Sequence, residues 1–531
     1  AAFRLGEPAR KGTVIAFTST SCPVSKRYAA TLAALERAYA GQGLGFVFIN
    51  PINSDSDEDL QATIRAKQFR GPWVRDADGR VRAALRARST AEVFVLDPAR
   101  RLIYRGAVDD QYGLGYSKSE PEVHYLRDAV EALLAGQNPA IPETSAPGCA
   151  LEPVSEKSGV AMPLTYHARI SRIMQRNCVE CHRSGGIAPF PLETFEQVSS
   201  HAGMIRRQVE KGLMPPWFAA PAEGPSPWLN DRTLPASDKS DLLAWLAAGK
   251  AEGDPADAPE PQRFDTEWAI GTPDLIFQIP EPIAVPAAGT LPYQNITLET
   301  GLTEDRWVSA LEIRPTAREV VHHALVFLAP ESAREDRPAR RRAREAGDFF
   351  AVYVPGNSSR VFSDGFAKLL PAGSALRFQI HYTPSGTATR DQLALGLKFA
   401  KEPPRHEVRV AAVAGRVDIP PGAENHETHG AVPVPFDARV LSFMPHMHLR
   451  GKAFRYELEV PGREKERLLE LPRYDFNWQL QYVLKEPADA PAGSRMLATA
   501  WYDNSTNNPA NPNPNQRVRW GEQTEDEMML G

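Results

Sequence analysis

The stretch Val320-Val-His322-His323-Ala-Leu-Val-Phe327 has the apolar, β-branched composition of a buried strand and carries two adjacent histidines in its middle. A second apolar strand, Phe378-Gln-Ile-His381-Tyr382, carries a third histidine. Both belong to a long region of short alternating strands separated by Pro/Gly turns, which is the pattern of a β-sandwich. The pattern pauses and restarts near 405–421, so we predict two all-β sandwich domains, over 263–418 and 419–531.

Adjacent residues of a regular strand face opposite sides. His322 and His323 could therefore bind one metal ion only if the strand ends or bulges there, or if the two rings use different nitrogens. Further along, Phe443-Met-Pro-His446-Met-His448-Leu-Arg-Gly-Lys452 places His446 and His448 two residues apart, with both rings on one face of a strand. Near the end, Trp520-Gly-Glu-Gln-Thr-Glu-Asp-Glu-Met528 offers a thioether.

The first 150 residues alternate short strands with helices, which predicts an α/β layer. The motif Thr18-Ser-Thr-Ser-Cys22-Pro-Val-Ser25 places a cysteine between a strand and a helix start, where the helix N-terminus lowers the pKa of a thiol. This placement resembles the thioredoxin-like redoxins, including peroxiredoxins. Ser25 stands where a dithiol motif needs a second cysteine. The domain is thus either a scaffold or a redox unit in which Cys22 works with Cys149.

Residues 151–262 contain Cys178-Val-Glu-Cys181-His182, the C-x-x-C-H attachment signature of a c-type haem. Cys178 and Cys181 would form thioethers, and His182 would bind the iron. Met214, in a rigid Met-Pro-Pro turn, is the predicted sixth ligand, and thioether ligation suits electron transfer. His167 and His201 are weaker candidates and are predicted to lie on the surface. The segment resembles a small all-α cytochrome c.

The composition of the chain excludes several classes of protein. The chain has 531 residues and a net charge of −5, with 61 basic and 66 acidic residues, so nothing indicates nucleic-acid binding. No apolar stretch reaches the roughly 18 residues of a membrane span. Four cysteines are too few for a disulfide framework. The charged segment Ala333–Gly347 is predicted to be a solvated loop or short helix, and Gly136–Pro163 a linker.

The histidine elements and the final Asp-Glu-Met, taken in order, resemble the copper type II, ascorbate-dependent monooxygenases, which include peptidylglycine α-hydroxylating and dopamine β-monooxygenases. The resemblance covers about 265–531. It implies that an electron-transfer copper is held by three histidines: His322, His323 and His381. It implies that an oxygen-binding copper is held by His446, His448 and Met528. Imidazole suits copper, and a thioether favours Cu(I) and disfavours zinc. His406, His426 and His429 match no ligand.

We therefore predict a multidomain, exported oxidoreductase with two copper ions and one covalently attached haem c. It would hydroxylate an activated C–H bond of an unidentified organic substrate with O2, using electrons from an external small reductant or redox protein that pass through the haem. Haem c is attached outside the cytoplasm, so a periplasmic or secreted location is expected, although no signal peptide is visible. The alternatives are an electron-transfer or copper-handling protein, and a thiol peroxidase fed by the haem and copper domains.

Overall fold

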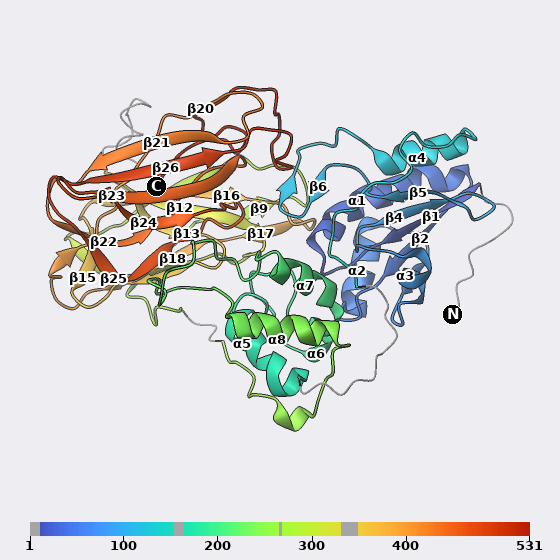
Figure 1. Ribbon diagram of the computed structural model, residues 1–531, viewed down its shortest axis with the longest axis horizontal. Coiled ribbons are helices and arrows are strands. Elements are labelled where there is room, and N and C mark those ends of the chain that lie inside the picture. Colours follow the sequence, from blue (N-terminus) through green and yellow to red (C-terminus); the bar gives the residue numbers. More distant parts are fainter. Residues whose placement is uncertain (1–10, 153–163, 265–267, 331–348) are drawn as a thin grey trace.

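The computed structural model describes residues 11–152, 164–264, 268–330 and 349–531. Figure 1 shows a blue α/β domain, a yellow-to-orange and an orange-to-red β-sandwich, and a green helical segment between and below them. The predicted loop or short helix at Ala333–Gly347 lies outside the described residues, as does the end of the predicted linker at Gly136–Pro163.

The N-terminal domain is built on one five-stranded sheet with the order β3-β2-β1-β4-β5. β1, β2 and β3 run parallel, while β4 and β5 run antiparallel to their neighbours. The order β2-β1-β4-β5 of its core, with the β1-α1-β2 crossover and the β4-β5 hairpin followed by α4, is that of a thioredoxin-like fold, as predicted. The strands are β1 (Gly12–Phe17), β2 (Leu44–Asn50), β3 (Trp73–Arg75), β4 (Val93–Leu96) and β5 (Leu102–Gly106), and the helices are α1 (Pro23–Tyr39), α2 (Asp57–Lys67), α3 (Arg80–Leu85) and α4 (Tyr125–Leu134).

The two faces of this sheet bury alternate residues, as the two-residue period of a strand requires. Val14 and Ala16 of β1 pack in one apolar cluster with residues of α1 and α4. Ile15 and Phe17 belong to a separate cluster on the other face, near α3. A short β6–β7 hairpin (Tyr112–Gly113 and Tyr116–Ser117) follows β5.

Residues 164–264 form helices and contribute no strand to any of the sheets in the described part of the chain. Buried Ile170, Met174 and Trp245 join the same apolar cluster as Cys22 and Leu126 of the thioredoxin-like domain, so these two parts share one core. The elements are η2 (Tyr166–Ile170), α5 (Ser171–Asn177), α6 (Phe195–Ser200), α7 (Ala202–Glu210), α8 (Ala236–Ala247) and η3 (Pro255–Asp257).

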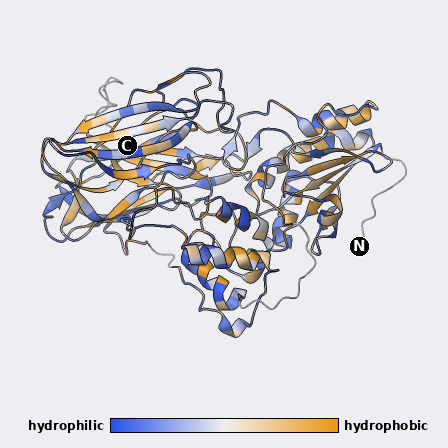
Figure 2. Cartoon of the chain, viewed as in Figure 1, coloured by the Kyte–Doolittle hydropathy of each residue, from blue (hydrophilic) through white to orange (hydrophobic). Residues whose placement is uncertain are grey.

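Two further cores fill the C-terminal half. The first sandwich contains the sheets β10-β16-β12-β13 and β19-β15-β11-β18-β8, and the second contains β21-β26-β23-β24 together with the pairs β22-β25 and β20-β27. Hydrophobic and hydrophilic residues alternate along many of these strands (Figure 2). In the first sandwich the strands are β8 (Leu275–Gln278), β9 (Ile283–Val285), β10 (Gln294–Glu299), β11 (Arg306–Arg314), β12 (Val321–Pro330), β13 (Phe349–Tyr353), β14 (Ser359–Val361), β15 (Phe366–Leu370), β16 (Ser374–Tyr382), β17 (Thr389–Asp391), β18 (Ala394–Phe399) and β19 (His406–Glu407). In the second they are β20 (Asp418–Ile419), β21 (His426–Pro433), β22 (Ala438–Phe443), β23 (Gly451–Glu459), β24 (Glu466–Leu471), β25 (Tyr482–Ala490), β26 (Arg495–Tyr502) and β27 (Val518–Arg519).

The segment between α7 and α8 lies on the second sandwich. The rings of Trp217 and Trp228 pack on Tyr482, with centroids 4.8 and 5.7 Å away. The Arg473 guanidinium donates hydrogen bonds to the carbonyls of Lys211 and Gly212. Among the described residues, no helix is long and apolar enough to cross a membrane.

Candidate metal centre

A β-bulge brings the two adjacent histidines to one side of their strand. β12 pairs with β16 so that Val321 lies opposite Tyr382 and His323 opposite His381, which leaves His322 as the extra residue. A bulge of this kind re-aims a side chain that a regular strand would point the other way. One ligand nitrogen from each of His322, His323 and His381 lies within 4.8 Å of the others, and the Nδ1 atoms of His322 and His323 are 3.1 Å apart.

Burial keeps these three rings neutral. It lowers the pKa of His322 to about 3 and that of His381 to about 4, with a smaller contribution from neighbouring histidines. The pKa of His323, which is 2% exposed, is also well below its usual value for the same reasons. A neutral imidazole is the form that binds metals, since a nitrogen lone pair is free.

His446 and His448 form a second pair in the connection between β22 and β23, with ring centroids 5.3 Å apart. His446 exchanges both backbone hydrogen bonds with Leu530, which ties the chain end to this connection. The His446 ring lies with Nδ1 2.8 Å from Gln479 Oε1. The His448 ring lies with Nδ1 3.3 Å from the carbonyl of Asp526. A carbonyl oxygen only accepts, so Nδ1 carries the proton in both rings and Nε2 keeps the lone pair.

The two histidine sets face each other across the junction of the two sandwiches. The ring centroids of His323 and His446 are 6.3 Å apart. Phe476 stacks on His322 at 4.8 Å and lies edge-on to His448 at 6.1 Å. Burial lowers the pKa of His446 to about 4 and that of His448 to about 3. Five neutral imidazoles from both sandwiches therefore form one cluster, in which His323 and His448 are buried and the other three are half-buried.

The carboxylate of Glu527 holds the backbone around the second histidine pair. Its buried carboxylate accepts hydrogen bonds from the backbone N–H groups of His448 at 2.8 Å, Arg450 at 2.6 Å and Met528 at 3.3 Å. Met528 is itself 8% exposed, and its carbonyl accepts a hydrogen bond from Tyr502 at 3.0 Å. The same carboxylate thus fixes the backbone of two predicted ligands, His448 and Met528.

The donor atoms fit a metal. His381 Nδ1 and His448 Nε2 are buried and have no hydrogen-bond partner. An unpartnered buried polar atom costs free energy, and coordination would satisfy it. His381 forms a three-imidazole set with the facing Nδ1 atoms of His322 and His323, and His448 belongs to the second pair; imidazole sets of this kind suit copper.

We expect the metal-free protein to become less stable in mild acid. The folded-state pKa values of His322, His381, His446 and His448 are about 3 to 4, against 6.5 in an unfolded chain. Between these values the unfolded state binds protons that the folded state excludes. The contribution of these histidines to the free energy of unfolding is therefore fully present above pH 6.5. It falls as the pH drops, by about 2 kcal/mol per histidine between pH 6.5 and 5. Thermal melts with a chelator at pH 7 and pH 5 measure this, and equal melting temperatures would contradict it.

The C-x-x-C-H motif directly follows α5. The His182 ring lies with Nδ1 2.9 Å from the Phe190 carbonyl, which leaves Nε2 as the free lone pair. Burial raises the pKa of Cys178 to about 12 and also raises that of Cys181. Met214 follows α7, and its backbone N–H donates to the Gln208 carbonyl.

The prediction that His201 and His167 lie on the surface is wrong. His201 is 3% exposed, and its ring stacks on Phe190 at 4.0 Å. Its Nε2 lies 3.2 Å from the Ser21 hydroxyl of the thioredoxin-like domain. The His167 side chain is 15% exposed and pairs with Glu252 at 3.6 Å. The sequence could not reveal that the thioredoxin-like domain contacts His201.

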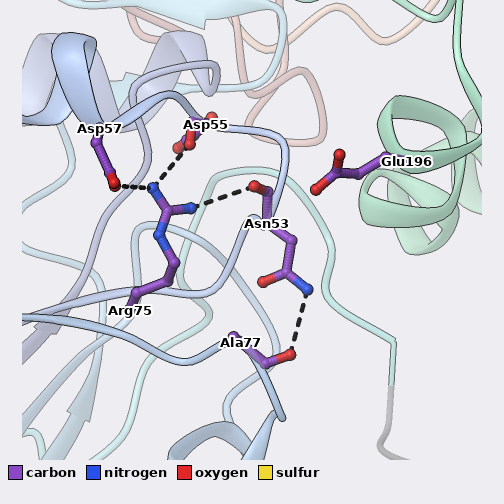
Figure 3. A pocket seen from close by; sticks show the side chains of 6 residues that line it. All are labelled: Asn53, Asp55, Asp57, Arg75, Ala77 and Glu196. Carbon is purple, nitrogen blue, oxygen red and sulfur yellow. Dashed lines mark hydrogen bonds and ion pairs between the residues drawn. The ribbon is translucent and has the colours of Figure 1, made fainter.

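Cys22 and Cys149 are brought into one buried apolar cluster, and Thr90 exchanges two hydrogen bonds with the Cys149 backbone. A separate pocket of about 430 Å³ lies nearby, between the Asn53–Asp57 loop and Glu196 of α6 (Figure 3). Its polar groups are largely paired, because Arg75 donates to Asp57 at 2.7 Å and Asn53 donates to the Ala77 carbonyl at 3.2 Å.

Sequence reasoning missed Gln479, Phe476 and the bracing role of Glu527. Glu527 could have been suspected, because a carboxylate directly beside a predicted ligand often orients it. Gln479 and Phe476 lie in an irregular connection between β24 and β25, where no periodic pattern marks them.

No family model matches the chain. Similar solved structures each match a part of the chain. A hypothetical protein from Sinorhizobium meliloti is 29% identical, covering 28% of this chain and 83% of that one, with a TM-score of 0.25. An uncharacterized conserved protein from Geobacillus kaustophilus is 27% identical over 29% and 84%, with a TM-score of 0.26. A secreted Mycobacterium tuberculosis disulfide oxidoreductase is 16% identical over 24% and 84%, with a TM-score of 0.19. Because these TM-scores are low, the fold assignment rests on the strand order.

Proposed function

We propose that the chain is a copper-dependent monooxygenase that hydroxylates an activated C–H bond with O2. The observation that carries this is the cluster of five neutral, buried or half-buried histidines that both sandwiches contribute. Its two parts contain the five histidines of the two ligand sets that the sequence resemblance implies, and Glu527 ties the backbone of Met528 to that of His448. His322, His323 and His381 would hold one copper ion, and His446, His448 and Met528 the other.

Bound copper would supply the one-electron steps and the activation of O2. The protein residues hold the rings in place and keep them neutral. Gln479 and the Asp526 carbonyl fix the tautomers of His446 and His448, so that both rings offer Nε2. The carboxylate of Glu527 fixes the backbone around His448 and Met528. Tyr293 packs on the ring of His381, and Phe476 stacks on the ring of His322.

A haem held by Cys178, Cys181 and His182 is the proposed internal electron donor. Support comes from the docking of the segment after α7, which carries Met214, onto the sandwich that carries His446 and His448. Fusion holds donor and acceptor at high effective concentration. An external small reductant or redox protein would reduce the haem, and haem attachment would take place outside the cytoplasm, in the periplasm or after secretion.

The proposal is tested by measuring whether the transfer of oxygen from O2 into a product depends on copper. The copper-loaded chain, supplied with ascorbate, is offered a panel of compounds with benzylic or amide-adjacent C–H bonds under ¹⁸O₂. We expect one labelled oxygen atom in the product for each O2 consumed, and no product from the zinc-loaded chain. If copper binds but no compound in the panel is labelled and O2 uptake is absent, the chain is instead an electron-transfer or copper-handling protein.

We expect one haem to remain covalently attached after denaturation and acid extraction. Cys178→Ser should leave a single thioether, and Met214→Ala should change the absorption spectrum in at least one oxidation state if the sulfur is the sixth ligand. Haem that extracts completely from the wild-type chain would contradict covalent attachment. A spectrum of Met214→Ala that equals the wild-type spectrum in both states would exclude Met214.

A further inference from the structure

Two cysteines that lie 127 positions apart (149 − 22) meet in the thioredoxin-like domain. Cys22 is the N-cap of α1, directly after β1, and Cys149 lies in the segment that follows α4. Both residues are buried free thiols of the same apolar cluster, and the thiol of each shifts the pKa of the other. Thr90 holds Cys149 in place: the Thr90 N–H donates to the Cys149 carbonyl, and the Cys149 N–H donates to Thr90 Oγ1, each at 3.0 Å.

The two thiols have different chemical character. Burial alone would raise the pKa of Cys22, but hydrogen bonds with Cys149, Thr90 and Ser25 outweigh it and lower the pKa to about 6. The pKa of Cys149 is well above its usual value, because its thiol is hydrogen-bonded to Cys22 and because it is buried. Cys22 is therefore the thiolate at neutral pH, and Cys149 holds its proton.

The loop that carries Cys22 is rigid. The Asp55 carboxylate accepts hydrogen bonds from the Ser19 hydroxyl at 2.8 Å and the Thr20 N–H at 2.9 Å. Ser25 occupies the place of a second cysteine in a C-x-x-C motif, and its hydroxyl donates to the Thr90 carbonyl at 2.7 Å. The partner that a redoxin usually finds three residues on is here supplied by Cys149.

We propose that Cys22 and Cys149 form a thiol–disulfide exchange centre that reduces small disulfides. The Cys22 thiolate attacks one sulfur of the substrate disulfide, whose S–S bond breaks and releases one thiolate. Cys149 then attacks the Cys22 sulfur of the mixed disulfide, loses its proton to the departing second sulfur, and closes the Cys22–Cys149 bond. Two electrons pass from the pair to the substrate, and two substrate thiols leave. The proposal is independent of the copper and haem chemistry.

The helical segment restricts the substrate to small molecules. His201 hydrogen-bonds Ser21, the neighbour of Cys22. At the start of α7, a Cβ on Gly203 would come within 2.7 Å of the Ala150 carbonyl, so this helix lies directly on the Cys149 segment. Glu152 is bound to it by Arg206 at 2.9 Å and Lys250 at 2.8 Å. A folded protein could not reach the sulfurs under this cover.

The test treats the reduced full-length protein with oxidised glutathione at pH 7, followed by acid quenching, alkylation and peptide mass mapping. We expect a Cys22–Cys149 disulfide in the wild type, a glutathione adduct on Cys22 in Cys149→Ser, and an unmodified Cys149 in Cys22→Ser. The serine variants keep the size and a hydrogen-bonding group at each position. Two alkylated thiols in the treated wild type would overturn the proposal, as would a glutathione adduct on Cys149. If the pair is oxidised by hydrogen peroxide but not by oxidised glutathione, the proposal is overturned and the pair is a peroxidase centre.

The cover is tested with a matched pair of variants. Glu152→Gln weakens both ion pairs to the helical segment, whereas Glu143→Gln weakens only ion pairs to Arg88 and Arg105 within the thioredoxin-like domain. We expect the Glu152 variant to react at least several-fold faster with oxidised glutathione, and the Glu143 variant to match the wild type. Equal rates in all three proteins would overturn the restriction to small disulfides.

Discussion

Replacing His381 with alanine should remove one of two copper ions and slow copper-dependent oxidation of the reduced haem by at least about 100-fold. Losing a partner of a metal ligand already costs 10–100-fold in affinity or activity, and losing a ligand costs more. His381 lies opposite His323 in the ladder and contributes one of the three clustered nitrogens. Stopped-flow absorbance of the haem after mixing with O2 measures the rate.

Two variants separate the metal effect from a general loss of structure. His381→Gln keeps most of the side-chain volume and should show the same loss of copper. His429→Ala removes a histidine whose side chain is 66% exposed on β21, away from the cluster, and should behave like the wild type. Haem oxidation that proceeds at the wild-type rate in both His381 variants would show that electrons do not pass through this site.

Replacing Glu527 with alanine should lower the free energy of unfolding by at least about 3 kcal/mol, since three buried N–H groups lose their acceptor at about 1–3 kcal/mol each. The side chain is fully buried, and Arg450, one of the three residues it holds, is 1% exposed. Glu525→Ala is the matched control, because that side chain is exposed and only its carbonyl binds Arg450.

Denaturant unfolding of the metal-free chains measures this free energy of unfolding. Copper titration measures a second expected effect, on copper affinity. Because Glu527 holds the backbone of His448 and Met528, the alanine variant should also bind copper more weakly at the second site. Glu527→Gln keeps one acceptor oxygen and should fall between the wild type and the alanine variant. If Glu527→Ala is as stable as Glu525→Ala, the carboxylate does not brace this region.

The sequence predicted the strands that carry His322, His323 and His381, because their apolar pattern is local. It also indicated that His322 and His323 could bind one metal ion at a bulge or at the end of the strand, since adjacent residues of a regular strand face opposite sides. The bulge itself could not be predicted, because it depends on the register with β16. The same limit applies to Cys22 and Cys149, whose contact depends on how the segment after α4 returns to Thr90.

The packing of the helical segment on the thioredoxin-like domain could also not be predicted from the sequence. His201 was predicted to be a surface residue and a weaker ligand candidate than Met214. The thioredoxin-like domain contacts its ring through Ser21. Gln479 escaped notice for a related reason: an uncharged residue in an irregular loop has no pattern, and only the folded chain places it 2.8 Å from the His446 ring.

The central claim is that the histidine cluster holds two copper ions, and copper stoichiometry tests it most directly. The full-length chain is loaded with excess copper, desalted, and analysed for metal and protein, alongside His381→Ala and His448→Ala. The account predicts two copper ions per chain in the wild type and one in each variant, with no displacement by an equal concentration of zinc at the site of His446, His448 and Met528. One copper ion or none in the wild type, or equal occupation of both sites by zinc, would contradict it.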